Sequence, residues 1–195
     1  MTSLAFQFDR YLLKRQVFAL TGRFRIYDPN ENLLLYSEQK MFRLREDIRV
    51  YADEDRTQEV LIIKARQIID FSAAYDVMES ATGQKVGTLR RKGWSSLLRD
   101  EWEILDPGDE PIGRVYEDSM GRALLRRFLL GTFLPQNYDI TLGTQRVGDL
   151  KQRFNLFAYR LELDFSMDAA RKLDRRLGIS AAILLAAIEG KESSN

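Results

Sequence analysis

The sequence predicts a mainly β fold: a closed antiparallel barrel of about twelve strands around a central hydrophobic C-terminal helix. Three observations point to it. Short segments of alternating apolar and polar residues recur between polar turns, a Val/Ile-Gly-x-Leu/Val unit repeats within them, and one long apolar segment follows the last strand. Together they describe a sheet that curves until it encloses its own helix.

Composition favours a single domain. The 195 residues are 45% hydrophobic, which suffices for one core, since a chain of this length buries roughly 70% of the surface that its unfolded form exposes. With four prolines and no Gly/Ser-rich stretch, nothing marks an internal boundary. We therefore expect one domain over residues 1–190 and a disordered tail at 191–195.

Alternation with a period of two residues marks the strands. It is clear in Val60–Lys64, Trp102–Leu105 and Tyr159–Phe165, and polar clusters such as Asp28–Asn32 and Asp106–Glu110 separate segments of this kind. This spacing is typical of consecutive antiparallel hairpins. Between residues 5 and 166 the sequence contains ten to twelve candidate strands.

An internal repeat accompanies these strands. The Val/Ile-Gly-x-Leu/Val unit occurs three times, with its glycines at Gly87, Gly113 and Gly148. The intervals of 26 and 35 residues are unequal, which argues against a solenoid of fixed period. A glycine within a strand marks a bend, which a curved wall requires. Each unit follows an apolar-Asp pair, at Tyr75-Asp76, Leu105-Asp106 and Tyr138-Asp139.

The alternating pattern stops after Phe165, and the residues that follow predict a helix over about 168–189. Its twelve uncharged residues from 177 to 188 span about 18 Å, short of the roughly 30 Å of a bilayer core, so we expect no transmembrane span. A helix that is apolar on all sides must be surrounded, and the sheet is the natural surround. The side chains expected inside the barrel are Leu177, Ile179, Ile183, Leu184 and Ile188.

The absence of two residue types excludes most of the catalytic and metal-binding sites that can be recognised from a sequence. The sequence contains no His and no Cys, which removes imidazole bases, thiolate nucleophiles, Cys/His metal sites and disulfides. No Gly-x-Ser-x-Gly motif or phosphate-binding Gly-rich loop occurs, and no pair stands out among the 29 acids. Acidic clusters such as Asp28–Asn32 are predicted as turns. We expect a non-catalytic protein with no cofactor and no metal site.

Charge is balanced overall but segregated along the chain. Residues 84–99 carry a local charge of +5, and residues 100–118 carry −7. These blocks can pair across neighbouring strands, or the cations can form a basic patch that attracts anionic lipid. A net charge of +1 is too small to indicate a nucleic-acid partner. The candidate lipid-binding residues are Lys85, Arg90, Arg91, Lys92, Arg126 and Arg127.

The ordered series Val86–Trp94, Trp102–Asp106 and Ile112–Val115, followed by a final strand and a hydrophobic helix, resembles LURP-one-related and phospholipid scramblase-like proteins. These belong to the tubby C-terminal-like superfamily, which implies a twelve-stranded barrel around a central helix. Its members include phosphoinositide-binding tubby domains, membrane-linked scramblases and plant defence-related proteins. Scramblases carry a palmitoylated Cys-rich segment and a Pro-rich extension that this sequence lacks, so lipid scrambling is less favoured.

The resulting expectation is a cytosolic, tubby-like domain that binds anionic, phosphoinositide-like membrane lipid through its basic patch and is peripheral at the membrane when bound. A cytoplasmic location follows from residues 1–10, which lack the basic region of a signal peptide. A protein-protein interaction or scaffold module with no lipid role is the open alternative. A scramblase or an enzyme is less favoured, and we expect a monomer.

Overall fold

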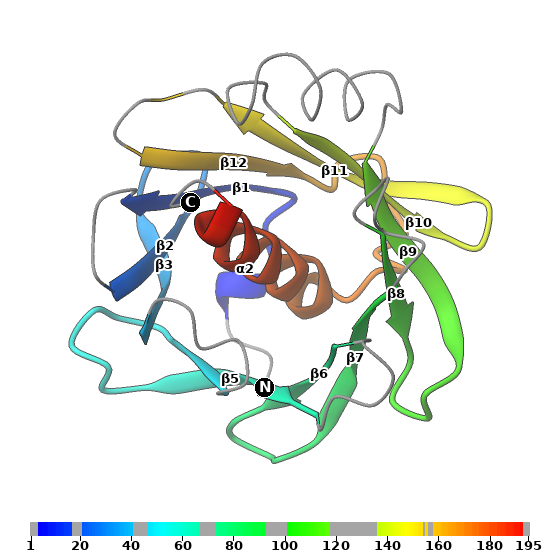
Figure 1. The fold of residues 1–195 in the computed structure, drawn as a ribbon, viewed down its shortest axis with the longest axis horizontal. Helices are drawn as coiled ribbons and strands as arrows, with labels where there is room; N and C mark the ends of the chain where they lie inside the picture. Colours follow the sequence, from blue (N-terminus) through cyan, green and yellow to red (C-terminus); the bar gives the residue numbers. More distant parts are fainter. Residues whose placement is uncertain are drawn as a thin grey trace.

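The computed structural model describes residues 4–16, 21–40, 47–66, 73–92, 101–117, 136–153, 155 and 158–192, with the backbone alone at 21, 39, 40 and 188–192. Neighbouring strands are antiparallel throughout, and β1 also pairs with β12, so the sheet closes on itself (Figure 1). The predicted closed barrel of twelve strands is confirmed. In chain order the elements are η1 (Leu4–Phe6), β1 (Arg10–Gln16), β2 (Thr21–Tyr27), β3 (Leu33–Lys40), β4 (Ile48–Tyr51), β5 (Glu59–Ala65), β6 (Ala74–Glu79), β7 (Lys85–Arg91), β8 (Glu101–Leu105), β9 (Pro111–Glu117), β10 (Asn137–Leu142), β11 (Gln145–Arg153), β12 (Ala158–Asp164) and α2 (Arg175–Glu192).

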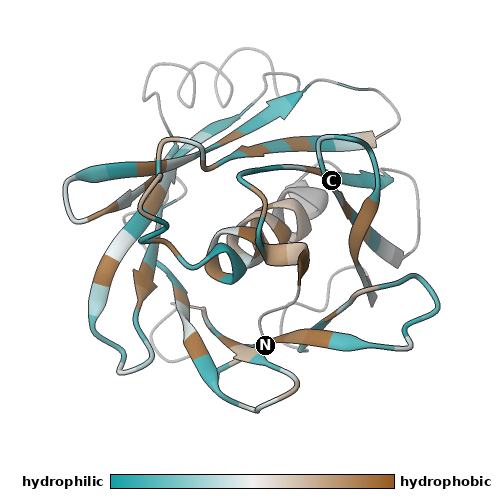
Figure 2. Cartoon of the chain, turned by 180° about the vertical axis from the view of Figure 1, so that it is seen from behind, coloured by the Kyte–Doolittle hydropathy of each residue, from teal (hydrophilic) through white to brown (hydrophobic). Residues whose placement is uncertain are grey.

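Side chains alternate between the two faces of the barrel wall. In β1, Tyr11 and Leu13 are buried, whereas Leu12 and Lys14 are partly exposed on the outer face. Figure 2 shows the same alternation of hydrophobic and hydrophilic residues along other strands. The inner faces of the strands therefore supply one continuous apolar lining.

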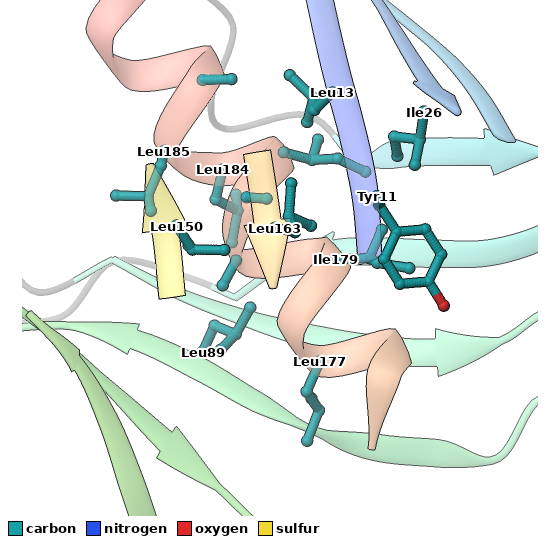
Figure 3. Packing of buried hydrophobic residues seen from close by; sticks show 14 of the residues in the cluster. Tyr11, Leu13, Ile26, Leu89, Leu150, Leu163, Leu177, Ile179, Leu184 and Leu185 are labelled. Carbon is teal, nitrogen blue, oxygen red and sulfur yellow. The ribbon is translucent and has the colours of Figure 1, made fainter. Parts of the chain in front are cut away.

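Helix α2 runs through the middle of this lining (Figure 1). Leu177, Ile179, Ile183 and Leu184 are at most 2% exposed, and the helix contacts β1, β6, β7 and β12. Figure 3 shows its side chains among those of the surrounding strands. The side chain of Ile188, which the sequence also places in the core, lies outside the described residues.

The helix begins at Arg175, not near residue 168 as predicted. Asp168 closes a turn instead, because its carboxylate accepts the backbone N–H groups four and five residues later, at 2.9 and 3.0 Å. An Asp side chain bonded to nearby backbone competes with helix formation. The N-cap is Asp174, whose carboxylate accepts the backbone N–H two residues later at 2.9 Å. At its other end the helix continues to Glu192, two residues into the predicted tail.

Arg175 anchors the first turn of α2. Its side chain is 2% exposed, and its guanidinium nitrogens lie 2.9 Å from Asp168 and 3.0 Å from Asp9. The same group lies 4.9 Å from the centre of the Phe165 ring. A buried charge is tolerated where it is paired and hydrogen-bonded. One side chain thus joins the helix to the segment before β1 and to the segment after β12.

Two glycines make room for the Phe165 ring. A Cβ atom at Gly148 of β11, or at Gly178 of α2, would lie 2.7 Å from a carbon of this ring. Tyr11 of β1 packs against it edge-on, with 6.1 Å between ring centres. The absence of side chains at the two glycines therefore lets the helix approach the wall at the point where Arg175 is anchored.

Five of the described hairpins share a β-bulge at the same place. In β2–β3, β4–β5, β6–β7, β8–β9 and β10–β11, one residue of the returning strand has no partner in the register. Bulges increase the local twist and bend a strand, so their repetition curves the wall. Four of these residues are spaced 26 apart, and the fifth follows after 35. They are Leu34, Val60, Val86, Ile112 and Val147.

The repeat differs from the predicted one in a single copy. In β6 and β10, the residue that faces the glycine follows Tyr75-Asp76 and Tyr138-Asp139, in agreement with the sequence pattern. In β8 this place belongs to Trp102-Glu103, as the register of Gly113 shows. Leu105-Asp106 leads into the turn, where the Asp carboxylate accepts two backbone N–H groups at 2.8 and 3.0 Å. In this copy the apolar-acidic pair therefore lies three residues earlier than the pair that the sequence pattern predicted.

Replacing Gly113 by Val should destabilise the barrel. A Cβ atom there would collide with the carbonyl oxygen of Thr141 in β10 and lie 2.7 Å from the side chain of Leu142. Because the backbone oxygen belongs to the β9–β10 ladder, we expect a loss of about 1–3 kcal/mol in the free energy of unfolding. The matched control Ile112→Val should change it by less than about 0.5 kcal/mol. Urea unfolding gives both values, and an unchanged midpoint for Gly113→Val would contradict the crowding.

Replacing Asp168 by Asn tests the anchor. Burial alone raises the pKa of Asp168, but hydrogen bonds from Arg175 and from two backbone N–H groups outweigh burial and hold this pKa below its usual range. Such a carboxyl stabilises the fold above its unfolded pKa of about 4, and the contribution is lost as the pH falls. We expect Asp168→Asn to lose about 3 kcal/mol at neutral pH, because Arg175 loses its buried counter-charge.

Thermal unfolding between about pH 7 and about pH 3 measures both effects of Asp168→Asn. The variant should lose less stability on acidification than the wild type does, since the titrating group is gone. A melting temperature equal to that of the wild type at neutral pH would show that the anchor contributes nothing.

Candidate functional site

Four of the six cations predicted as a lipid-binding patch are described, and they lie on β7 or directly after it. Successive side chains of a strand point to opposite faces, so these four cannot all share one surface. The structure therefore separates what the sequence shows as one basic run. The described cations are Lys85, Arg90, Arg91 and Lys92, whereas Arg126 and Arg127 lie outside the described residues.

Two of these cations pair with the acidic block on β8. Arg90 lies opposite Glu103 in the ladder, with 2.7 Å between Nη2 and a carboxylate oxygen. Lys92 places its Nζ atom 3.0 Å from Glu101 and 3.4 Å from Glu103. The hydrogen bond to Glu101 raises the pKa of Lys92. Burial raises the pKa of Glu103, but Arg90 and Lys92 together bring it below its usual range.

Lys85 belongs to a separate charge network near the hairpin turns. Its Nζ atom lies 2.6 Å from Asp109 and 3.5 Å from Asp76. Arg66 bridges the same two carboxylates at 2.6 and 2.7 Å, and Thr88 donates a hydrogen bond to Asp76 at 2.8 Å. Hydrogen bonds from Lys85 and Arg66 hold the pKa of Asp109 well below its usual range. The network joins β6 and β7 to the β8–β9 turn.

Arg91 points to the opposite face from its two neighbours. It lies opposite Trp102, whose side chain is buried, and the ring of Tyr75 lies 6.0 Å from that of Trp102. Burial raises the pKa of Tyr75, and the charge of Arg91 partly offsets this. Arg91 is therefore directed to the inner side of the wall.

The two blocks of opposite charge thus meet across the β7–β8 ladder. The sequence allowed either this pairing or a basic patch for anionic lipid. Lys85, Arg90 and Lys92 each have a carboxylate oxygen within 3.0 Å. Pairs that are exposed to solvent contribute about 0–1 kcal/mol each to stability. This side of the wall therefore has its charges largely paired, although the segment around β7 is strongly basic in sequence.

A second set of cations crosses four neighbouring strands on the other side of the barrel. In the ladder Arg153 faces Arg160, Arg160 faces Lys14, and Lys14 faces Arg25. We call these four residues the cation row. Its members lie up to 146 positions apart, from 14 to 160, so no local run of charge marks them in the sequence. Only the closure of β1 onto β12 brings them together.

The acidic turns bind their own backbone. The carboxylate of Asp28 accepts N–H groups of Asn30 and Asn32, both at 2.8 Å, as expected of a turn. Among the described residues, no group of three or more acidic side chains is placed to hold a metal ion. Within the same part of the chain, no helix has the length and apolar composition that crossing a membrane requires.

Reversing one charge of the β7–β8 pairs should destabilise the barrel, and reversing both should restore part of the loss. Arg90→Glu places two carboxylates opposite each other, so we expect it to cost about 0.5–1 kcal/mol. Adding Glu103→Arg recreates an ion pair of opposite polarity, although Lys92 then faces a new cation. A urea-unfolding double-mutant cycle measures the coupling. A double variant less stable than either single variant would contradict a direct pair.

Comparison with known proteins agrees with this architecture. The family model described as LURP-one-related matches residues 33–186, which is most of the chain and extends from β3 into α2. No curated protein matches the chain, and no solved structure matches it either. The match covers four of the five bulged hairpins, the returning strand of the other, and the central helix as far as residue 186. The chain therefore belongs to the LURP-one-related family.

Proposed function

We propose that the protein is a non-catalytic binding domain that attaches to anionic membrane surfaces through the outer wall of its barrel. The observation that carries this proposal is the filling of the interior by α2. Ile179, Ala182, Ile183 and Ala186 are fully buried, so the helix occupies the space in which a barrel of this kind would hold a ligand. A ligand then has to contact the outside, where the side chains are mostly charged.

The cations on the outer wall remain accessible although many are paired. The side chains of Arg90 and Lys92 are 41% and 39% exposed. An exposed ion pair is worth about 0–1 kcal/mol, and each cation near an anionic membrane gains about 1 kcal/mol. An anionic surface can therefore compete with the carboxylate partners at little net cost.

The titration behaviour of the carboxyl groups supports a non-catalytic role. A general acid at neutral pH needs a raised pKa. The carboxyl groups of Asp76, Asp109 and Asp168 have pKa values below their usual range, held down by hydrogen bonds and nearby cations. These groups are ionised ion-pair partners, which fits a structural role.

A protein partner is the second candidate. The close balance of cations and carboxylates on the β7–β8 side suits a surface of complementary charge pattern, because such pairs give specificity between proteins. This alternative predicts no preference for anionic vesicles.

Liposome sedimentation decides between the two candidates. We expect the protein to pellet with vesicles of equal parts phosphatidylcholine and phosphatidylserine, and to stay in solution with phosphatidylcholine alone. Binding should weaken between low and physiological salt, because the Debye length falls from about 30 Å at 0.01 M to about 8 Å at 0.15 M. Failure to pellet with the anionic vesicles at low salt would remove the membrane role and leave a protein partner.

A further inference from the structure

We propose that the cation row of Arg25, Lys14, Arg160 and Arg153 is the part of the wall that binds the phosphate headgroups of an anionic membrane. The inference rests on the proposed membrane function and names the face that performs it. The row crosses β2, β1, β12 and β11, on the other side of the barrel from β7. It is distinct from the cations that the sequence singled out.

All four side chains of the row lie on the outer face. Lys14 is flanked along β1 by the buried Leu13 and Arg15, and Arg25 and Arg160 are likewise flanked by buried neighbours on their strands. Arg153 is itself exposed and lies opposite Arg160 in the ladder, on the same face. Because strands alternate their side chains, the row members point outward. Neighbouring strands are about 4.8 Å apart, so the row is about 14 Å long. That length presents several cations at once to a layer of headgroups.

The row is only partly neutralised by carboxylates. Arg160 is exposed and has no ion-pair partner among the residues that the structure describes. Two of the three carboxylates near the row come from the hairpin connections after β2 and β4, not from the row's own strands. The pairs are Arg153 with Glu162 at 2.8 Å, Arg25 with Glu54 at 2.7 Å, and Lys14 with Glu31 at 3.7 Å.

The fold by itself gives no reason for this arrangement. Like charges placed directly opposite each other in a ladder are destabilising, and Arg160 has Lys14 on one side and Arg153 on the other. On the β7–β8 side, by contrast, Arg90 faces a carboxylate. An anion that binds between the cations relieves their repulsion, so ligand binding restores the stability that this repulsion removes from the ladder.

The chemistry of the row suits phosphate. A planar guanidinium group can bind phosphate oxygens with two parallel hydrogen bonds, and Arg160 has no carboxylate partner among the described residues. Arg25 and Arg153 would exchange the carboxylates of Glu54 and Glu162 for phosphate. Lys14 is held in place, because its Nζ atom lies 4.6 Å from the centre of the Tyr27 ring and its side chain is 27% exposed. A side chain that is already ordered loses less entropy on binding.

A row of carboxylates also crosses neighbouring strands of the same wall. Asp139 faces Asp149, which faces Asp164. Arg146 pairs with the first two, Lys151 with the second and Arg10 with the third. Along β12, Asp164 is four residues from Arg160, which is about 13 Å at 3.3 Å per residue. That separation exceeds the Debye length of about 8 Å at physiological salt. Both their distance and their own cation partners therefore leave the attraction of the row intact at physiological salt.

The experiment compares two double variants of the full chain by sedimentation with vesicles of equal parts phosphatidylcholine and phosphatidylserine. Lys14→Gln with Arg160→Gln removes two cations of the row. Arg49→Gln with Lys64→Gln removes two exposed cations from β4 and β5 and is the matched control. We expect the row variant to lose about 30-fold in partitioning, or about 2 kcal/mol at 1.4 kcal/mol per tenfold. The control should stay within about threefold of the wild type.

A folding check accompanies this comparison. Arg160→Gln alone has no described ion pair to lose and relieves repulsion, so its thermal midpoint should equal or exceed that of the wild type while its vesicle binding falls. A midpoint lowered well below the wild type would mean that Arg160 serves the fold, and would overturn the inference.

The remaining outcomes separate the inference from the function on which it rests. Equal losses in the two double variants would overturn the row as the binding face and leave membrane binding intact. No binding of the wild type to these vesicles would overturn both. If the wild type then bound inorganic triphosphate in a titration, and the row variant did not, the ligand would be a free phosphate compound and the membrane assignment would be wrong.

Discussion

A helix that is apolar on every side, as α2 is from Leu177 to Ala186, stays out of water only if protein contacts it all round. A flat sheet would cover one side of it, so twelve strands have to close around it. Closure removes the sheet edges, which would otherwise be templates for aggregation. It also gives each strand an apolar inner face and a polar outer face. The barrel, its core and its charged wall thus depend on the enclosure of one segment.

Closure around a helix requires a curved wall and a point at which the chain enters the barrel. Small local features of the sequence provide both. The bulges at Leu34, Val60, Val86, Ile112 and Val147 bend five hairpins at the same place in each. At the entrance, the Phe165 ring lies against two glycines and under the guanidinium of Arg175. Polar residues thus fix the start of α2, and burial of its apolar side chains holds the remainder of the helix inside the barrel.

The fold class could be predicted from sequence because its two signals are local: alternation with a period of two, and an apolar segment too short to cross a bilayer. The start of the helix could not be predicted. The carboxylate of Asp168 accepts backbone N–H groups and so holds a turn in a segment whose residues otherwise favour a helix. The repeat was misaligned in β8, where Trp102-Glu103 takes the place of Tyr-Asp. Such an error disappears only when the register is known.

The candidate site was predictable only in part, for a reason of distance along the chain. Lys85, Arg90 and Lys92 stand out as a basic run, but their carboxylate partners become visible only when β7 and β8 pair. The cation row has no local signal, since Lys14 meets Arg160 through the pairing that closes the barrel. Charge patterns on a closed sheet are properties of its register.

Native-state hydrogen exchange tests most directly whether enclosure of α2 holds the barrel together. If it does, the backbone amides of residues 179–186 exchange only through global unfolding, with the same opening free energy as the slowest amides of β1 and β12. Helix amides that open at a free energy several kcal/mol below that of the strands would show that α2 leaves a barrel that persists without it, and would contradict the account.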